Sequence, residues 1–227
     1  MESLIDREIT WQKYIGGDII NKEFINIFKI STAVYEQIEN EYKAVLSTDE
    51  INKASRFMQV NDSKLFILGK YFLRDIIGKL KGIAPSSVIF SFIENKKPAT
   101  SGINFNVSHS GNYVVIGIST EALGVDIEER VDMFDYKSLL STCFTKNEIR
   151  HINEDIDFYT FWTRKEAILK ATGEGLIDDL LLIDCVENEV YRNDTKYRIK
   201  SHEVDNNYLL SIASCALIPK YQYWALH

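Results

Sequence analysis

Two segments of the chain repeat each other, and this repeat limits the possible folds more than any other feature of the sequence. Residues 112–119, Asn-Tyr-Val-Val-Ile-Gly-Ile-Ser, are similar to residues 207–214, Asn-Tyr-Leu-Leu-Ser-Ile-Ala-Ser. The pair Ser108-His109 recurs as Ser201-His202 at nearly the same separation. An internal repeat of this kind predicts two similar structural units within one chain.

The elements expected around these segments come in the same order in both halves. Residues 47–50 and 145–148 have the Ser/Thr-x-x-Glu pattern of a capping box, which marks a helix N-terminus. Each box precedes a longer apolar helix, expected over 64–80 and over 158–172. Strand-like runs come after each long helix, at 87–93 and 114–118 in one half and at 181–186 and 208–213 in the other. We therefore expect an α+β fold of two similar α/β halves, with a boundary near residues 120–123.

Length and composition are those of an ordinary globular protein. The 227 residues are 45% hydrophobic and 26% charged, enough to bury a core as one large domain or as two compact halves. The first residues lack the apolar core of a signal peptide, and no apolar run approaches the roughly 18 residues of a membrane span. The three cysteines are widely spaced without a C-x-x-C pair, which favours buried thiols over disulfides or zinc. We expect a cytoplasmic protein that does not enter a membrane.

The charge balance argues against one class of partner. A net charge of −7 with a pI of about 5.2 does not suit nucleic-acid binding, which needs a basic face to neutralise phosphates. Basic residues nevertheless concentrate in the first half, where a local patch attracts an anion despite the acidic total. They are Lys64, Lys70, Arg74, Lys79, Lys81, Lys96 and Lys97. Solvated surface lysines are the alternative explanation.

A pair of acids two residues apart suggests a metal site. Asp126 and Glu128 lie in a β-favouring run, so their side chains share one face of a strand while Val125 and Ile127 point to the other. Two carboxylates about 6.5 to 7 Å apart repel each other by about 2 to 3 kcal/mol. Glu166 would add a third charge, and oxygen ligands of this kind favour Mg²⁺ over zinc. A solvated strand end with two exposed acids is the alternative.

The helix expected over 158–172 carries two further candidates. Glu166 and Lys170 are one turn apart, and Gly173 ends the helix. Trp162 continues their row on the helix surface, so the row borders the buried stripe and Glu166 is expected to be partly buried. An ordinary i,i+4 ion pair on the surface is the alternative interpretation.

Residues 108–110, Ser-His-Ser, form a polar cluster at the expected tip of a hairpin. They come after the apolar and polar alternation of residues 103–107, and Gly111 and Asn112 supply the turn. Hydroxyl groups, an imidazole and turn amides at this tip are able to hold phosphate oxygens. A polar turn without any function fits the same residues equally well.

Taken together, these segments resemble the motifs of the 4′-phosphopantetheinyl transferases, in particular the long, single-chain type that activates surfactin synthetase. The matching motifs are Phe105-Asn-Val-Ser-His-Ser110, Gly124-Val-Asp-Ile-Glu128 and Trp162-Thr-Arg-Lys-Glu-Ala-Ile-Leu-Lys170, in the family's order, with Lys97-Pro98 before the first. Weaker similarity extends from about Phe24 to Ala213. The resemblance implies two α/β halves related by a pseudo-twofold axis, each with helices on a mainly antiparallel sheet, and coenzyme A (CoA) bound between them.

The resemblance also divides the chain and assigns residue roles. It implies an N-terminal extension over 1–20, an N-terminal half over 21–121 and a C-terminal half over 122–227 that carries most metal ligands. The family's Mg²⁺ ligands fall on Asp126, Glu128 and Glu166, with Glu166 also its general base, and its phosphate contacts fall on Lys170 and His109. Positions that bind the nucleotide part of CoA fall on Lys53, Lys64, Lys97 and Ser108. Two departures affect the nucleotide end: Lys64 stands alone where the family often has Arg or His, and Glu50 stands where a basic contact occurs.

By this resemblance, the chain is expected to transfer the 4′-phosphopantetheine group of CoA to a serine hydroxyl of an acyl or peptidyl carrier protein. The products would be the holo-carrier protein and adenosine 3′,5′-bisphosphate, with Mg²⁺ as cofactor. Two alternatives use the same acids: an Mg²⁺-dependent phosphohydrolase of CoA or a nucleotide, and a CoA-binding module without turnover. A chain that holds both halves need not pair with itself, so we expect a monomer.

Overall fold

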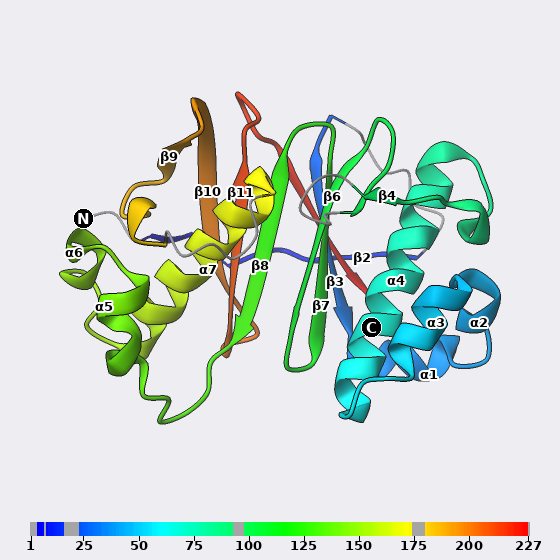
Figure 1. Ribbon diagram of the computed structural model, residues 1–227. Coiled ribbons are helices and arrows are strands. Elements are labelled where there is room, and N and C mark those ends of the chain that lie inside the picture. Colours follow the sequence, from blue (N-terminus) through cyan, green and yellow to red (C-terminus); the bar gives the residue numbers. More distant parts are fainter. Residues whose placement is uncertain (1–3, 7, 16–22, 93–97, 174–179, 227) are drawn as a thin grey trace.

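The computed structural model describes residues 4–6, 8–15, 23–92, 98–173 and 180–226. Two five-stranded sheets form its centre (Figure 1). The first sheet has the order β2 (Gln12–Lys13), β12 (Tyr221–Leu226), β3 (Ile25–Ser31), β7 (Tyr113–Ser119) and β6 (Asn104–Ser110). The second has the order β1 (Ile5–Asp6), β10 (Thr195–Val204), β11 (Tyr208–Ser214) and β8 (Leu123–Glu129), with β9 (Glu189–Arg192) also paired to β10. Strands β4 (Ser91–Phe92) and β5 (Pro98–Ala99) pair with each other in a separate antiparallel two-stranded sheet.

Two long helices dominate the helical part of the chain, α4 (Val60–Lys81) and α7 (Asp155–Thr172). Several short helices precede each of them. They are η1 (Thr32–Val34), α1 (Tyr35–Ile38), α2 (Tyr42–Val45) and α3 (Thr48–Ala54) before α4, and η4 (Tyr136–Leu139), α5 (Leu140–Cys143) and α6 (Lys146–Ile149) before α7. Short 3₁₀ turns η2 (Pro85–Ser87) and η5 (Leu180–Leu182) come after the long helices.

The apolar side chains form three clusters, which define the layers of the fold. The first lies between α4 and the first sheet and includes Leu68 and Ile76 of α4 and Ile116 of β7. The second lies between α7 and the second sheet and includes Ile168 of α7 and Leu209 of β11. The third cluster joins the remaining faces of the two sheets and includes Ile27, Val115, Val125, Ile127, Leu210 and Ile212. The sheets therefore lie between the two long helices, which are on opposite sides in Figure 1.

The expected helices are present, and the two predicted capping boxes are formed. Ser47 and Glu50 form a complete capping box at α3, as do Thr145 and Glu148 at α6. Helix α7 ends at Gly173, which has a φ of 80°. Both long helices start slightly before the predicted residues, and the strands predicted over 114–118 and 208–213 lie within β7 and β11.

Two predicted strands are wrong in whole or in part. The segment predicted over 181–186 contains η5 and irregular backbone, and within 87–92 only β4 is a strand. In the first of these segments, buried side chains take the place of a neighbouring strand: Lys165 donates to the carbonyls of Leu180 and Ile183, and Arg164 Nε to that of Cys185. Because the backbone bonds to side chains, an apolar composition there does not produce a strand.

The strands near the two ends of the described chain are distributed over both sheets. Strand β1 pairs in parallel with β10 of the second sheet, whereas β2 pairs in parallel with β12 of the first. Strand β12 comes from the second half of the sequence but inserts between β2 and β3. Among the described residues, no helix combines the length and apolarity needed to cross a membrane.

Candidate active site

Side chains of β6 connect it to β8, the neighbouring strand of the other sheet. The amide N–H groups of Val125, Ile127 and Glu129 donate to side-chain oxygens of Asn106, Ser108 and Ser110, at 3.0, 3.3 and 3.0 Å. The spacing of two residues on both strands keeps these contacts in register. We call this row of contacts the β6–β8 seam. It places the Ser-His-Ser motif directly beside the acids of β8.

Asp126 and Glu128 lie on one face of β8, as the sequence predicts. Asp126 is buried, and its Oδ1 accepts hydrogen bonds from Ser108 Oγ at 2.9 Å and Lys170 Nζ at 2.6 Å. Glu128 Oε2 accepts from Ser110 Oγ at 2.9 Å. The alternative of two fully solvated acids at a strand end is therefore wrong.

Glu166 and Lys170 reach this face because α7 approaches β8 very closely. At Gly124 an added Cβ would lie 2.0 Å from the carbonyl oxygen of Ala167, so only glycine allows the contact. Glu166 is buried, at 9% exposure, and the negative charge of Asp126 raises the pKa of the Glu166 carboxyl group. Lys170 bonds to Asp126 and to Ser108, which excludes a simple surface pair with Glu166 as its only role.

The electrostatics of the three acids favour a bound cation. Burial raises the pKa of Asp126, of Glu166 and of Glu128, the last to about 7. The Asp126 carboxylate raises the pKa of the other two further, whereas Lys170 lowers all three. Asp126 Oδ2 and Glu166 Oε1 are buried and have no hydrogen-bond partner among the residues that the structure describes. Burying a carboxylate oxygen without a partner costs free energy of folding. Such oxygens are suitable ligands for a hard divalent cation.

The acids are not already arranged as a complete metal site. Among the described residues, no group of three or more His, Cys, Asp or Glu side chains is positioned to hold a metal ion. The Lys170 ammonium instead neutralises part of the charge of Asp126, through the 2.6 Å contact. The donor set fits Mg²⁺ in its chemistry, and the lysine is the cation that the structure shows there.

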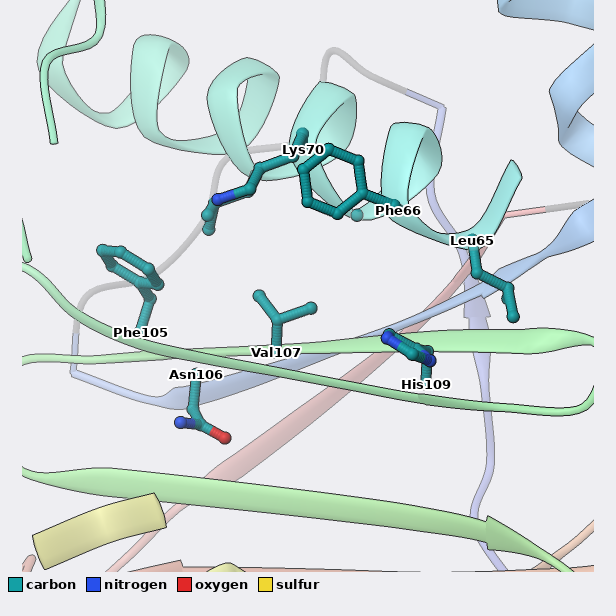
Figure 2. A pocket seen from close by; sticks show the side chains of 9 residues that line it. Leu65, Phe66, Lys70, Phe105, Asn106, Val107 and His109 are labelled. Atoms are coloured by element: carbon teal, nitrogen blue, oxygen red, sulfur yellow. The ribbon is translucent and has the colours of Figure 1, made fainter. Parts of the chain in front are cut away.

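His109 points to the other side of β6 from Ser108 and belongs to a different part of the site. It lines a cavity of ≈ 240 Å³ between α4 and β6, which Figure 2 shows from close by. Desolvation of the ring and the Lys170 ammonium lower the pKa of His109, so the neutral imidazole is favoured. The cavity is lined by Leu65, Phe66, Gly69, Lys70 and Leu73 of α4 and by Phe105, Asn106, Val107 and His109 of β6.

A second cavity of ≈ 460 Å³ adjoins the first and shares Phe66 and Lys70 with it. Lys53 of α3 lines this cavity, and its ammonium lies 5.2 Å from the ring centroid of Phe66. Glu50 also lines it, but its carboxylate is engaged by Arg74 Nε at 2.9 Å.

The remaining candidates for the nucleotide end have other positions. Lys64 lines neither cavity, and its ammonium lies 5.0 Å from the ring centroid of Tyr35. Ser108 is buried in the β6–β8 seam, where its hydroxyl contacts Asp126, Lys170 and the amide of Ile127. Lys97 lies outside the described residues.

Phe66 and Lys70 line both cavities. Sequence reasoning assigned no role to Phe66 and named Lys70 only among the basic residues of the first half. Their spacing of four residues, with Leu73 one turn further, places them on one face of α4. The same spacing in the sequence is a signal that could have indicated a shared site.

Comparison with known proteins identifies the family. Residues 35–121 match the N-terminal domain of 4′-phosphopantetheinyl transferases, and residues 122–213 match the 4′-phosphopantetheinyl transferase superfamily. The 4′-phosphopantetheinyl transferase HetI of Nostoc sp. is 32% identical over 180 residues, which are 74% of this chain and 76% of HetI. The chain belongs to the 4′-phosphopantetheinyl transferase superfamily.

Within that superfamily the chain is of the Sfp type, the long single-chain type that its motifs resemble. Sfp of Bacillus subtilis is 28% identical over 204 residues, covering 82% of this chain and 88% of Sfp. A putative 4′-phosphopantetheinyl transferase of Synechocystis sp. is 28% identical over 200 residues, covering 77% and 81%. The activity is transfer of 4′-phosphopantetheine from CoA to carrier proteins. Family membership favours this reaction over the hydrolase and the binding module.

Proposed function

We propose that the chain carries out this transfer with Mg²⁺ held by Asp126, Glu128 and Glu166. The observation that supports the proposal most strongly is the pair of buried carboxylate oxygens without partners, Asp126 Oδ2 and Glu166 Oε1, beside the Lys170 ammonium. When bound, Mg²⁺ supplies positive charge that stabilises the negative charge of the CoA diphosphate.

The side chains around the acids have complementary roles in the proposal. Lys170, with 28% of its side chain exposed, contacts the diphosphate and offsets charge that develops there. His109 faces the adjoining cavity and contacts the diphosphate from the other side of β6. Glu166 accepts the proton of the incoming serine hydroxyl at Oε1, and a pKa raised by burial suits that role.

The proposed reaction is a displacement at phosphorus. The serine oxygen of an acyl or peptidyl carrier protein bonds to the phosphorus nearest the pantetheine, and the bond from that phosphorus to the bridging oxygen breaks. Adenosine 3′,5′-bisphosphate leaves with the bonding electrons. The nucleotide part of CoA occupies the cavities along α4, near Lys53 and His109. Ser108, Lys64 and Lys97 stay predicted contacts of CoA.

We also propose that the two halves arose by duplication and are related by a pseudo-twofold axis. Tyr113 and Tyr208 occupy equivalent places, at the starts of β7 and β11. Their rings contact each other with centroids 4.9 Å apart. Contact between equivalent residues is what an axis between the halves requires. The proposed division into residues 21–121 and 122–227 leaves the strands of residues 4–15 as additions to both sheets.

Mass spectrometry of a carrier protein tests the proposed function. The protein is mixed with Mg²⁺, CoA and an apo carrier, and we expect the carrier to gain the mass of phosphopantetheine only when Mg²⁺ is present. Asp126→Asn removes one ligand charge at nearly constant volume and should slow transfer by about 10²- to 10³-fold. Glu121→Gln, an exposed acid just before β8, is the matched control and should leave the rate unchanged.

Two outcomes would contradict the proposal. No added mass on any of several apo carriers would refute transfer, and CoA consumed without a carrier would indicate hydrolysis. An Asp126→Asn variant as active as the wild type would refute the metal assignment.

A further inference from the structure

The turn between β6 and β7 is held by side chains of the second half of the chain. Tyr208, at the start of β11, accepts a hydrogen bond from the Asn112 amide at 3.2 Å and donates one to Glu129 Oε1 at 2.9 Å. An added Cβ at Gly111 would lie 2.2 Å from Glu129 Oε2 and 2.5 Å from the Tyr208 oxygen, so the turn packs directly on both side chains. We call the group of Tyr208, Glu129 and the Asn112 amide the Tyr208 clamp.

The hydroxyl group of Tyr208 is the centre of this clamp. Tyr208 is buried, and burial raises the pKa of its hydroxyl. The hydrogen bond from Asn112 lowers that pKa and the Glu129 carboxylate raises it, with a net increase. The hydroxyl therefore keeps its proton at neutral pH and donates it to Glu129 while it accepts from Asn112. Removal of this one oxygen would take a partner from both groups at once.

The clamped turn is continuous with the acid site. Ser110, the residue before Gly111, accepts from the Glu129 amide at 3.0 Å and donates to Glu128 Oε2 at 2.9 Å. Glu129 thus holds the end of the hairpin twice, through its amide at Ser110 and through its carboxylate at Tyr208. A movement of the turn would carry the Ser110 hydroxyl away from Glu128.

The second half of the chain has an equivalent tyrosine contact without an acid site beside it. The hydroxyl of Tyr113 hydrogen-bonds to Asp205 in the turn between β10 and β11, and Lys29 Nζ contacts the same carboxylate at 2.5 Å. Each tyrosine therefore binds the turn of the opposite half. The first turn directly follows the Ser-His-Ser motif beside β8, whereas the second follows β10, which β11 separates from β8.

We propose that Tyr208 is a positioning residue for the Mg²⁺ site: its clamp on the β6–β7 turn holds the Ser110 hydroxyl on Glu128 and thereby fixes the direction of that carboxylate. The inference rests on the proposed function, since it takes Glu128 as a ligand of Mg²⁺. Tyr208 acts through Ser110, because its own hydroxyl bonds to Asn112 and Glu129. Hydrogen-bond partners that orient a metal ligand typically change metal affinity by about 10- to 100-fold.

Metal binding without turnover tests the proposal. Mg²⁺ is titrated calorimetrically into the protein saturated with CoA, with no carrier present. Tyr208→Phe removes the hydroxyl and keeps the ring that packs on Tyr113. We expect the affinity for Mg²⁺ to fall by about tenfold. In the transfer assay, the Mg²⁺ concentration for half-maximal rate should rise by a similar factor, with KM for CoA little changed at saturating Mg²⁺.

Tyr113→Phe is the matched control. It removes the same atom at the equivalent place, and Asp205 keeps its contact with Lys29. Both variants should lower the melting temperature, by about 2 to 8 °C, because each loses a hydrogen bond of a buried group. Only Tyr208→Phe should weaken Mg²⁺ binding, so a loss of stability alone does not imitate the expected result.

A pair of variants at Glu129 tests the other side of the clamp. Glu129→Gln keeps an oxygen that accepts from Tyr208 and should bind Mg²⁺ nearly as tightly as the wild type does. Glu129→Ala removes the acceptor and should lose affinity as Tyr208→Phe does. The pair separates hydrogen bonding from the negative charge of Glu129, and it keeps the test available if Tyr208→Phe fails to fold.

The outcomes distinguish this proposal from the proposed function. Equal Mg²⁺ affinities of Tyr208→Phe and Tyr113→Phe would overturn the role of Tyr208, as would a Glu129→Gln variant as weak as Glu129→Ala. Both results leave the proposed metal ligands in place. Asp126→Asn with the Mg²⁺ affinity of the wild type would instead refute the metal assignment, and the role of Tyr208 with it.

Discussion

The raised pKa of the Glu128 carboxyl group makes the stability of the folded protein depend on pH. Burial and the Asp126 carboxylate raise the pKa of Glu128 from 4.5 to about 7. Because the pKa is higher in the folded state, ionisation of Glu128 disfavours that state. The stability that this group contributes is fully present below pH 4.5 and is lost as the pH rises through about 7.

This shift predicts a pH dependence that a metal should reverse. Without Mg²⁺ we expect the melting temperature to fall between about pH 5 and pH 8, with Glu128 accounting for about 3 kcal/mol at most. Glu128→Gln should remove part of the fall, since the pKa values of Asp126 and Glu166 are raised in the same direction. Thermal denaturation with EDTA or with Mg²⁺ measures it. The same pH dependence in wild type and variant would contradict the assignment, as would a lack of stabilisation by Mg²⁺ at about pH 8.

At the residue scale, the sequence predicts those positions that depend on periodicity within one element. Alternation along a strand correctly places Asp126 and Glu128 on one face, and helical spacing correctly places Glu166 beside buried residues. The partners of Ser108 were not predictable, because they depend on the β6–β8 seam between strands of different sheets. The place of Lys70 in a cavity was not predicted for a similar reason, since the cavity exists only where α4 crosses β6.

At the scale of elements, the position of α7 on β8 decides whether the acids meet. Gly124 is the closest contact point: an added Cβ would lie 2.0 Å from the Ala167 carbonyl oxygen and 2.5 Å from the Ala171 nitrogen. Both neighbours are backbone atoms, so the helix would have to shift as a body. A shift of α7 would move Glu166 and Lys170 away from Asp126.

Gly124→Ala should therefore reduce both stability and transfer. We expect a loss of stability of about 1 to 3 kcal/mol from overpacking, and weaker Mg²⁺-dependent transfer because the ligands separate. Gly102→Ala is the control: its φ of 75° imposes backbone strain, but an added Cβ has no neighbour within 4 Å. Chemical denaturation and carrier labelling of both variants provide the measurements. Gly124→Ala activity equal to that of Gly102→Ala would show that the close approach does not position the site.

Elements with local signals were predictable, and those made by tertiary contacts were not. The capping boxes at Ser47 and Thr145 and the glycine after α7 have short-range causes, and they are confirmed. The strand predicted over 181–186 is wrong because Lys165 and Arg164, both buried on α7, donate to the carbonyl oxygens of Ile183 and Cys185. An apolar run alone does not reveal such partners.

At the scale of the whole molecule, β12 ties the two halves of the sequence together. It inserts between β2 and β3 and pairs with both in parallel. Trp224 of β12 lies in the first core cluster, where it stacks on Phe28 and donates to Asn26 Oδ1 at 3.1 Å. The repeat predicts two similar units, but nothing local in residues 221–226 indicates that they join the first sheet, since parallel partners so distant in sequence leave no turn signal between them.

Deletion of residues 219–227 tests how far the first sheet depends on β12. The deletion exposes the edge of β3, removes the partner of β2 and empties the place of Trp224, whose loss alone is worth about 3 to 5 kcal/mol. We expect the melting temperature to fall by at least about 10 °C and transfer to be lost, although none of the proposed metal ligands is removed. Leu217→Ser with Ile218→Ser, at two exposed positions before β12, should cost little and serves as the control. In the intact protein, far-ultraviolet circular dichroism and tryptophan fluorescence should report one coincident transition, because the sheets share the third core cluster.

If the shortened chain melted and labelled carriers as the full chain does, β12 would be an addition that neither the sheet nor the site requires.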